Sequence, residues 1–182
     1  QGPNVSSSEA ILITPAGPIK AESLDTAIEV ADGLDITLAW PEGWRDRLLQ
    51  RRQYLAGDDA CRVSQLVDAL DTKADRLWMA RGGYGCIRTL AAALEQGVEL
   101  FGRPPTPLWG FSDGTALLGA WMRAGWPAWL SPPLTQLERL DPVSRARWRA
   151  GWHGGEVPTF RGLKTLKGGR ATAPLTGGNL AV

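Results

Sequence analysis

Apolar residues occur along this chain in short runs, separated by longer segments of mixed polarity. Short apolar runs bounded by proline or glycine are typical of buried strands. The sequence predicts five such strands, at Ile11–Ile13, at Ile36–Trp40, at Leu77–Ala80, in the residues that follow Pro107, and at Pro127–Leu130.

The segments between these runs carry apolar residues three and four positions apart, which is the spacing of one helix face. The predicted stripes are Leu24, Ile28 and Ala31; Val63, Leu66, Val67 and Leu70; Ile87, Leu90, Ala91 and Leu94; and Leu117, Ala120, Trp121 and Ala124. Gly33 would end the first helix, and Asp58 or Asp59 can cap the second. The arginine-rich segment Trp44–Leu55 is interpreted as a solvated helix or connection. Strands that alternate with helices predict an α/β fold with a mostly parallel sheet flanked by helices.

The regular alternation ends after residue 131. Asp141-Pro142 predicts the start of a further helix, which would pack Trp148 against Trp152. We expect residues 1–8 to be disordered or a remnant of expression, residues 9–160 to form the α/β domain, and the glycine-rich residues 161–182 to be a linker that leads into another domain.

Composition narrows the class of protein. With 43% hydrophobic and 21% charged residues and a net charge of +1, the 182-residue chain gives no case for binding nucleic acid or a membrane. No apolar run is long enough to span a bilayer. Cys61 and Cys86 lack paired spacing and suit a reducing compartment, so a cytoplasmic location is expected. Without histidine or cysteine clusters we expect neither a metal site nor a cofactor.

Ser112 lies in the literal motif Gly110-Phe111-Ser112-Asp113-Gly114, between the fourth strand and the helix that follows. In a nucleophile elbow, the serine takes a strained position at such a turn, with its hydroxyl exposed above the strand ends. The alternative is a plain connection in which Ser112 or Asp113 caps the helix.

A second loop, Arg81-Gly82-Gly83-Tyr84-Gly85, directly follows the third strand. Ligands in open α/β sheets bind at the carboxyl ends of the strands, and glycines let backbone N–H groups approach a ligand closely. The loop could cradle a phosphate, supply an oxyanion donor, or form only a tight connection.

Together, A-R-G-G-Y-G at 80–85 and G-F-S-D-G-T-A-L at 110–117 resemble the LD-carboxypeptidase family, serine peptidases of murein tetrapeptide recycling that include microcin C self-immunity peptidases. Further matching pieces are Ile13–Gly17, Tyr54–Gly57 and Gly177–Leu180. The resemblance implies a flavodoxin-like or Rossmann-like N-terminal domain that carries the nucleophile of a Ser-Glu-His enzyme.

In this reading Ser112 is the nucleophile, and the backbone N–H groups of Asp113 and Gly83 form the oxyanion hole. Arg81, Gly82 and Tyr84 are candidate substrate-binding residues. The resemblance places the catalytic glutamate and histidine in a C-terminal domain beyond residue 182. The partner would be a murein peptide or a related small peptide, with a microcin-like peptidyl nucleotide left open, and the sequence is compatible with a homodimer.

Two positions depart from the family pattern: Gly114 stands where an isoleucine is usual, and Leu130-Ser131-Pro132 replaces a His-Gly-Pro-like segment. His153, the only histidine, lies in a glycine-rich turn and is expected to be solvated rather than catalytic. An esterase-like α/β-hydrolase and a non-catalytic module that binds a small anion remain alternatives. An α/β-hydrolase would need its catalytic acid and base after the Ser112 turn, and few residues of this sequence follow that turn.

Overall fold

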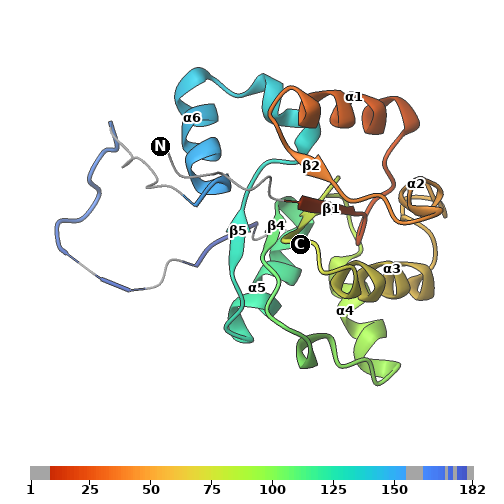
Figure 1. Ribbon diagram of the computed structural model, residues 1–182. Helices are drawn as coiled ribbons and strands as arrows, with labels where there is room; N and C mark the ends of the chain where they lie inside the picture. Colours follow the sequence, from red (N-terminus) through yellow and green to blue (C-terminus); the bar gives the residue numbers. More distant parts are fainter. Residues whose placement is uncertain (1–8, 155–161, 171, 174–175, 180–182) are drawn as a thin grey trace.

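The sheet of this protein is built from parallel strands, as Figure 1 shows. The structure, a computed structural model, describes residues 9–154, 162–170, 172–173 and 176–179. Within them the sheet has the order β2-β1-β3-β4-β5. The strands are β1 (Glu9–Ile13), β2 (Thr37–Leu38), β3 (Arg76–Met79), β4 (Leu108–Gly110) and β5 (Ala128–Leu130). This is the flavodoxin-like order, so the predicted α/β class is confirmed.

Helices lie on both faces of the sheet. The helices are α1 (Ala21–Asp32), α2 (Trp44–Leu48), α3 (Asp59–Asp71), α4 (Cys86–Glu95), α5 (Thr115–Arg123) and α6 (Pro142–Trp152), with short 3-10 turns η1 (Leu100–Gly102), η2 (Ser112–Gly114) and η3 (Leu134–Arg139). In Figure 1, α1 and α6 lie on one side of the sheet, and α3, α4 and α5 lie on the other. Asp58 caps α3 through the N–H of Cys61, and Asp141 caps α6, as the sequence predicts.

Two elements differ from their predictions. The second strand is limited to Thr37–Leu38, because it is an edge strand that pairs only with β1. The Trp44–Leu55 segment is less solvated than expected. Trp44 and Leu48 of α2 are buried, and the indole N–H of Trp44 donates to the carbonyl of Leu12 over 2.9 Å.

The largest disagreement concerns α4. Of its predicted apolar stripe, Leu90 packs against the core, but Ile87, Ala91 and Leu94 face outward. Cys86, Thr89, Ala92 and Ala93 are buried instead, and the side chain of Leu94 is 77% exposed. The small residues allow α4 to pack closely against α3 and α5, and the side chains of Ile87 and Leu94 are left on the surface.

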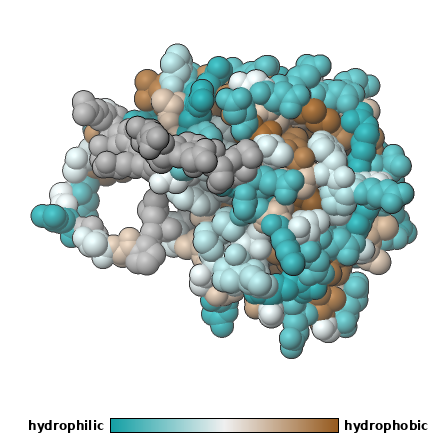
Figure 2. All heavy atoms as spheres, viewed as in Figure 1, coloured by the Kyte–Doolittle hydropathy of each residue, from teal (hydrophilic) through white to brown (hydrophobic). Residues whose placement is uncertain are grey.

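Tryptophans fill much of the core. Trp78 on β3 contacts both Trp148 and Trp152, and those two rings stack on each other with centroids 5.1 Å apart, so their predicted pairing is confirmed. Hydrophilic residues cover most of the face seen in Figure 2. Across the described residues, no helix has the length and hydropathy needed to cross a bilayer.

Candidate active site

Two loops meet at the carboxyl edge of the sheet, where β1 and β3 lie side by side. The loop after β1 contains Gly17, whose N–H donates to the carbonyl of Gly82 in the loop after β3, over 3.1 Å. In a flavodoxin-like sheet this is the point where strand order reverses and where a crevice for ligands forms. The glycine loop therefore lies where the sequence predicts a site.

Ser112 lies at the sharp turn between β4 and α5. Its φ is +52°, in the left-handed region that residues other than glycine rarely adopt. The hydroxyl of Thr115 donates to the carbonyl of Ser112 over 2.7 Å and so holds the turn. The strained strand-to-helix turn predicted at this serine is present, and the side chain of Ser112 is half-buried.

The glycine loop lies directly against Ser112. A β-carbon at Gly82 would come within 2.9 Å of the Ser112 β-carbon and 3.3 Å of its Oγ. At Gly83, whose φ is +122°, a β-carbon would lie 3.0 Å from the backbone of Gly17. The close approach of three backbone segments explains why glycine occupies these positions. That the N–H groups of Gly83 and Asp113 share one space beside Ser112 stays a prediction.

Asp113 connects the Ser112 turn to the start of α4. Its buried carboxylate accepts a 2.7 Å hydrogen bond from the backbone N–H of Cys86, the first residue of α4, through Oδ2. The other oxygen, Oδ1, is buried and has no hydrogen-bond partner among the described residues. Burial, together with the charge of Asp113, raises the pKa of the Cys86 thiol far above its ordinary value. The turn and the loop that precedes α4 are thus fixed to each other by a side chain.

A buried arginine on α3 stabilises the loop after β1 through a chain of hydrogen bonds. Arg62 on α3 donates to the hydroxyl of Thr89 over 3.0 Å and to the carbonyl of Gly57 over 2.8 Å. Thr89 in turn donates to the carbonyl of Pro15, in the loop that carries Gly17. Asp59 pairs with both Arg62 and Arg88 and balances the buried charge.

The remaining predicted site residues lie at the rim. Arg81 donates to the carbonyl of Pro18 over 3.0 Å. Tyr84 is 46% exposed and faces Tyr54 across 6.0 Å between ring centroids. His153 is exposed at the C-terminal end of α6.

Two further residues, Met79 and Thr115, contribute to the turn, and neither was predicted from the sequence to do so. The thioether of Met79 lies beside both Gly110 and Gly114. Thr115 also accepts a 3.0 Å hydrogen bond from the N–H of Asn179, so the matching piece at Gly177–Asn179 reaches the first turn of α5. Leu180, the last residue of that piece, lies outside the described residues, as do residues 1–8. No local pattern in the sequence signals these contacts, because they join segments far apart in the chain.

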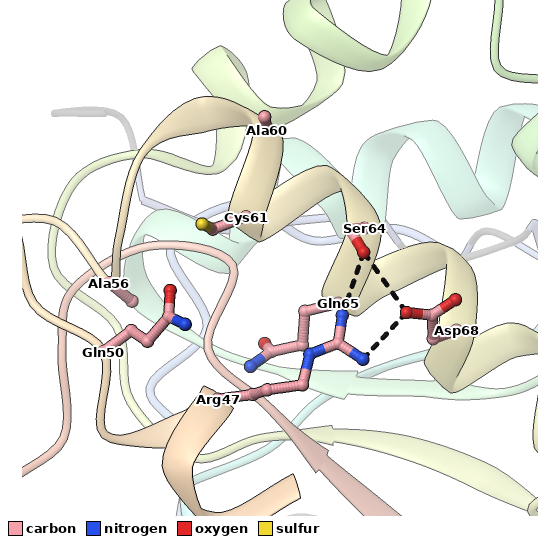
Figure 3. Close-up of a pocket in the computed structure, with 8 residues that line it drawn as sticks. All are labelled: Arg47, Gln50, Ala56, Ala60, Cys61, Ser64, Gln65 and Asp68. Carbon is pink, nitrogen blue, oxygen red and sulfur yellow. Dashed lines mark hydrogen bonds and ion pairs between the residues drawn. The ribbon is translucent and has the colours of Figure 1, made fainter. Parts of the chain in front are cut away.

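Outside this site, a hollow of about 420 Å³ lies between α2 and α3 and contains several polar side chains (Figure 3). Arg47 extends from α2 to Ser64 and Asp68 on α3, forming an ion pair with Asp68 and a hydrogen bond with Ser64. A hydrogen bond to Asp58, with burial, raises the pKa of Cys61. Gln65 accepts a hydrogen bond from the N–H of Thr14, so these side chains hold α2 and α3 to the end of β1.

The fold and the site define a class: an α/β domain with a strained serine at the carboxyl edge of a parallel sheet, packed against a glycine loop. The sequence pattern of the LD-carboxypeptidase N-terminal domain matches residues 11–131, and the chain belongs to this family. Membership decides against the esterase-like α/β-hydrolase.

Individual relatives agree with the family. The chain is 36% identical over 139 residues to a murein tetrapeptide carboxypeptidase of Pseudomonas aeruginosa. The aligned region covers 75% of this chain and 42% of that protein. Its fold is similar to that of the microcin C7 self immunity protein MccF, with a TM-score of 0.62 and 14% identity over 81% of this chain and 43% of the other. It is also similar to muramoyltetrapeptide carboxypeptidase from Oxalobacter formigenes, with a TM-score of 0.58 and 19% identity over 79% and 47% of the two chains. The chain thus spans less than half the length of these proteins.

Proposed function

We propose that this chain is the nucleophile-bearing domain of a serine carboxypeptidase that hydrolyses the amide bond between an L-centre and a D-amino acid, as in a murein tetrapeptide. The observation that carries the proposal is the strained turn at Ser112, packed against Gly82 in a domain of this family. A left-handed serine at a strand-to-helix turn is the geometry of a nucleophile elbow, which exposes the hydroxyl to substrate.

In the proposed reaction, Ser112 Oγ attacks the carbonyl carbon of the scissile amide and transfers its proton to a histidine oriented by a glutamate. The N–H groups of Asp113 and Gly83 stabilise the oxyanion of the tetrahedral intermediate. The amide C–N bond then breaks, the histidine returns the proton to the leaving nitrogen, and the D-amino acid departs. Water hydrolyses the acyl-enzyme. The histidine and glutamate are the residues that the family resemblance places beyond residue 182.

The rim of the site supplies the proposed substrate contacts. Arg81 and Tyr84 flank Gly82 and Gly83, and a guanidinium at the rim of the site suits a substrate with carboxylates. A murein peptide is favoured over a peptidyl nucleotide. The relative of higher identity is a murein tetrapeptide carboxypeptidase, whereas MccF, whose solved complexes contain aspartyl sulfamoyl adenosine, shares only 14% identity. If its substrates are murein peptides recovered for reuse, the enzyme acts in the cytoplasm.

The test is release of D-alanine from an L,D-linked murein tetrapeptide by the complete protein. Ser112→Ala should reduce turnover by about 10³-fold or more, since the nucleophile is lost. Ser64→Ala, a matched change on α3, should leave turnover unchanged. The 182-residue chain alone should be silent, because a serine hydroxyl is a weak nucleophile without a base. Full activity of Ser112→Ala would refute the proposal.

A further inference from the structure

Thr89 on α4 is a fully buried polar residue that joins α3, α4 and the loop after β1. It is 0% exposed, and its hydroxyl accepts a 3.0 Å hydrogen bond from Nε of Arg62. The same hydroxyl donates to the carbonyl of Pro15 over 2.9 Å. A hydroxyl has one proton to donate and lone pairs with which to accept, so it can join a donor to an acceptor. Valine has nearly the same shape but can do neither.

Arg62 holds the hydroxyl of Thr89 in place from the side of α3. Its guanidinium also donates to the carbonyl of Gly57 and pairs with Asp59, so each of its three nitrogen atoms has an acceptor. The side chain of Arg62 is completely buried. Buried polar networks are rigid when every member is satisfied. The position of the Thr89 hydroxyl is therefore fixed from behind.

The loop that Thr89 holds lies against the glycine loop. Gly17, two residues after Pro15, donates its N–H to the carbonyl of Gly82 over 3.1 Å. The two backbones are so close that a β-carbon at Gly83 would lie 3.0 Å from the backbone of Gly17. A shift of the loop after β1 must therefore move the glycine loop as well.

Thr89 also holds the end of the glycine loop directly. Gly85 immediately precedes α4, and its carbonyl accepts a 2.8 Å hydrogen bond from the N–H of Thr89. A β-carbon at Gly85 would lie 3.1 Å from the α-carbon of Ala16, so this end also contacts the loop after β1. Because Gly82 packs directly against Ser112, the two loops together set the backbone that faces the serine.

We infer that Thr89, held by Arg62, is a positioning residue of the proposed peptidase. Its hydroxyl fixes the loop after β1, and through that loop the glycine loop that would supply an oxyanion donor beside Ser112. This inference rests on the proposed function. Thr89 is too deeply buried to touch a substrate, so it acts only through the loops. Its effect is on turnover, because an oxyanion donor stabilises charge that develops in the transition state.

The first experiment removes the hydroxyl and keeps the shape of the side chain. In the complete protein, Thr89→Val should lower kcat for D-alanine release from the murein tetrapeptide by about 10-fold, with little change in KM, because the oxyanion donor is misplaced. Thr89→Ser keeps the hydroxyl and should retain most of kcat. Ala93→Gly is the matched control: Ala93 is also buried in α4, and glycine there destabilises the helix without removing a hydrogen bond to either loop. It should leave kcat unchanged.

Two further measurements report on the loop itself. The probe for the oxyanion site is a peptide in which a boronic acid replaces the scissile carbonyl. Ser112 Oγ adds to the boron with loss of its proton, and a boronate oxygen then takes the place of the oxyanion. Thr89→Val should bind this probe about 10-fold more weakly than the wild type, in parallel with kcat. Backbone N–H groups of residues 82–85 should exchange with solvent faster in Thr89→Val than in Thr89→Ser.

If Thr89→Val does not fold, Thr89→Ala takes its place, since it admits a water to the unpaired groups but has no fixed hydroxyl. Unchanged kcat and boronic acid affinity in a folded variant without the hydroxyl would overturn the inference. Equal losses of kcat in Thr89→Val and Thr89→Ser, or in Ala93→Gly, would assign the effect to packing or stability and also overturn it.

A wild-type protein that releases no D-alanine contradicts the proposed function instead. Hydrogen exchange then decides whether Thr89 holds the glycine loop: faster exchange of residues 82–85 in Thr89→Val supports the hold, and equal exchange in Thr89→Val and Thr89→Ser overturns it.

Discussion

The sulfur of Met79 on β3 lies where a β-carbon at Gly114 would come within 2.5 Å of it. At Gly110, on the other side of Ser112, a β-carbon would lie 2.8 Å from the same sulfur. Both glycines of the G-x-S-x-G motif therefore lie against one methionine beneath the turn, and a larger residue at either position would require that side chain to move. Gly114, which departs from the isoleucine expected from the family resemblance, is the residue of the motif whose β-carbon would come nearest to Met79.

Gly114→Ala should lower the free energy of unfolding by about 1–3 kcal/mol, because the new methyl group overpacks the core against Met79. Combining it with Met79→Ala should cost less than the sum of the two single changes, with a coupling of about 0.5–3 kcal/mol. Urea unfolding of the four proteins measures this cycle. The control is Gly119→Ala on α5, where a β-carbon meets nothing within 4 Å and the helix gains stability. Strict additivity of the two core changes would contradict the steric account.

Gly82→Ala should reduce turnover of the complete enzyme by about 10²-fold, since its β-carbon would displace Ser112, and small errors in the placement of a reacting group are costly. The loss should appear in kcat under conditions in which the variant is folded, and its melting temperature should fall, because the new methyl group overpacks a buried position. Gly97→Ala serves as the control outside the site, although its φ of +66° gives it a stability cost that must be measured separately. An unchanged kcat for a folded Gly82→Ala protein would show that the loop does not position the serine.

Asp113→Ala should destabilise the fold by about 1.5–3 kcal/mol, because it removes a charge-assisted hydrogen bond to the N–H of Cys86 from a buried site. Asp113→Asn keeps an acceptor for that N–H and should retain more of both stability and kcat. Denaturant unfolding and steady-state kinetics of the two variants separate these effects. Equal losses in both would mean that the charge, rather than the connection between the turn and α4, is what matters.

The two cysteines should differ in reactivity. Cys86 is buried, and burial with the nearby Asp113 charge raises its pKa, so its thiol should not react with a disulfide reagent in the native protein. Cys61 is partly exposed, but its pKa is also raised, so it should react slowly at neutral pH and faster as the pH increases. Native Cys61→Ser should release almost no chromophore, and the unfolded variant should release that of one thiol. Rapid labelling of native Cys61→Ser would contradict the burial of Cys86.

Asp59 should make stability depend on acid pH. A hydrogen bond from Arg88, and the charge of Arg62, lower its pKa in the folded protein. A group with a lowered folded pKa binds protons more readily when unfolded, so its contribution is complete above about pH 4 and is lost as the pH falls through the folded value. Asp59→Asn should therefore flatten the acid limb of the stability curve. Glu42→Gln, at an exposed residue in no described ion pair, should leave the limb unchanged. A parallel limb in Asp59→Asn would contradict this role.

The sequence predicts the order of strands and helices well, because proline, glycine and apolar runs mark their limits locally. It also places Ser112 and the glycine loop at one edge, since parallel strands share a carboxyl edge. It fails at α4, where the pattern shows which residues share a face but not whether that face meets the sheet. Thr89, Ala92 and Ala93 are buried because they are small enough for close packing, and Leu94 is left outside.

The contacts that hold the site together could not be predicted from the sequence either. Asp113 with Cys86, Arg62 with Thr89, and Met79 with Gly114 join residues more than 25 positions apart. No periodicity in one sequence reports such pairs. The motifs therefore indicate where the candidate site lies, and only the structure shows the long-range contacts that support it.

The hydroxyl of Thr115 both donates to the carbonyl of Ser112 and accepts from the N–H of Asn179. The hydroxyl oxygen of Thr115 thus links residue 179 to the turn that contains Ser112 through two hydrogen bonds. A longer loop between α6 and Gly177 would cost conformational entropy that grows only slowly with loop length. The place of residue 179 beside Ser112 is therefore set by its contact with α5 and not by the length of the chain between α6 and Gly177.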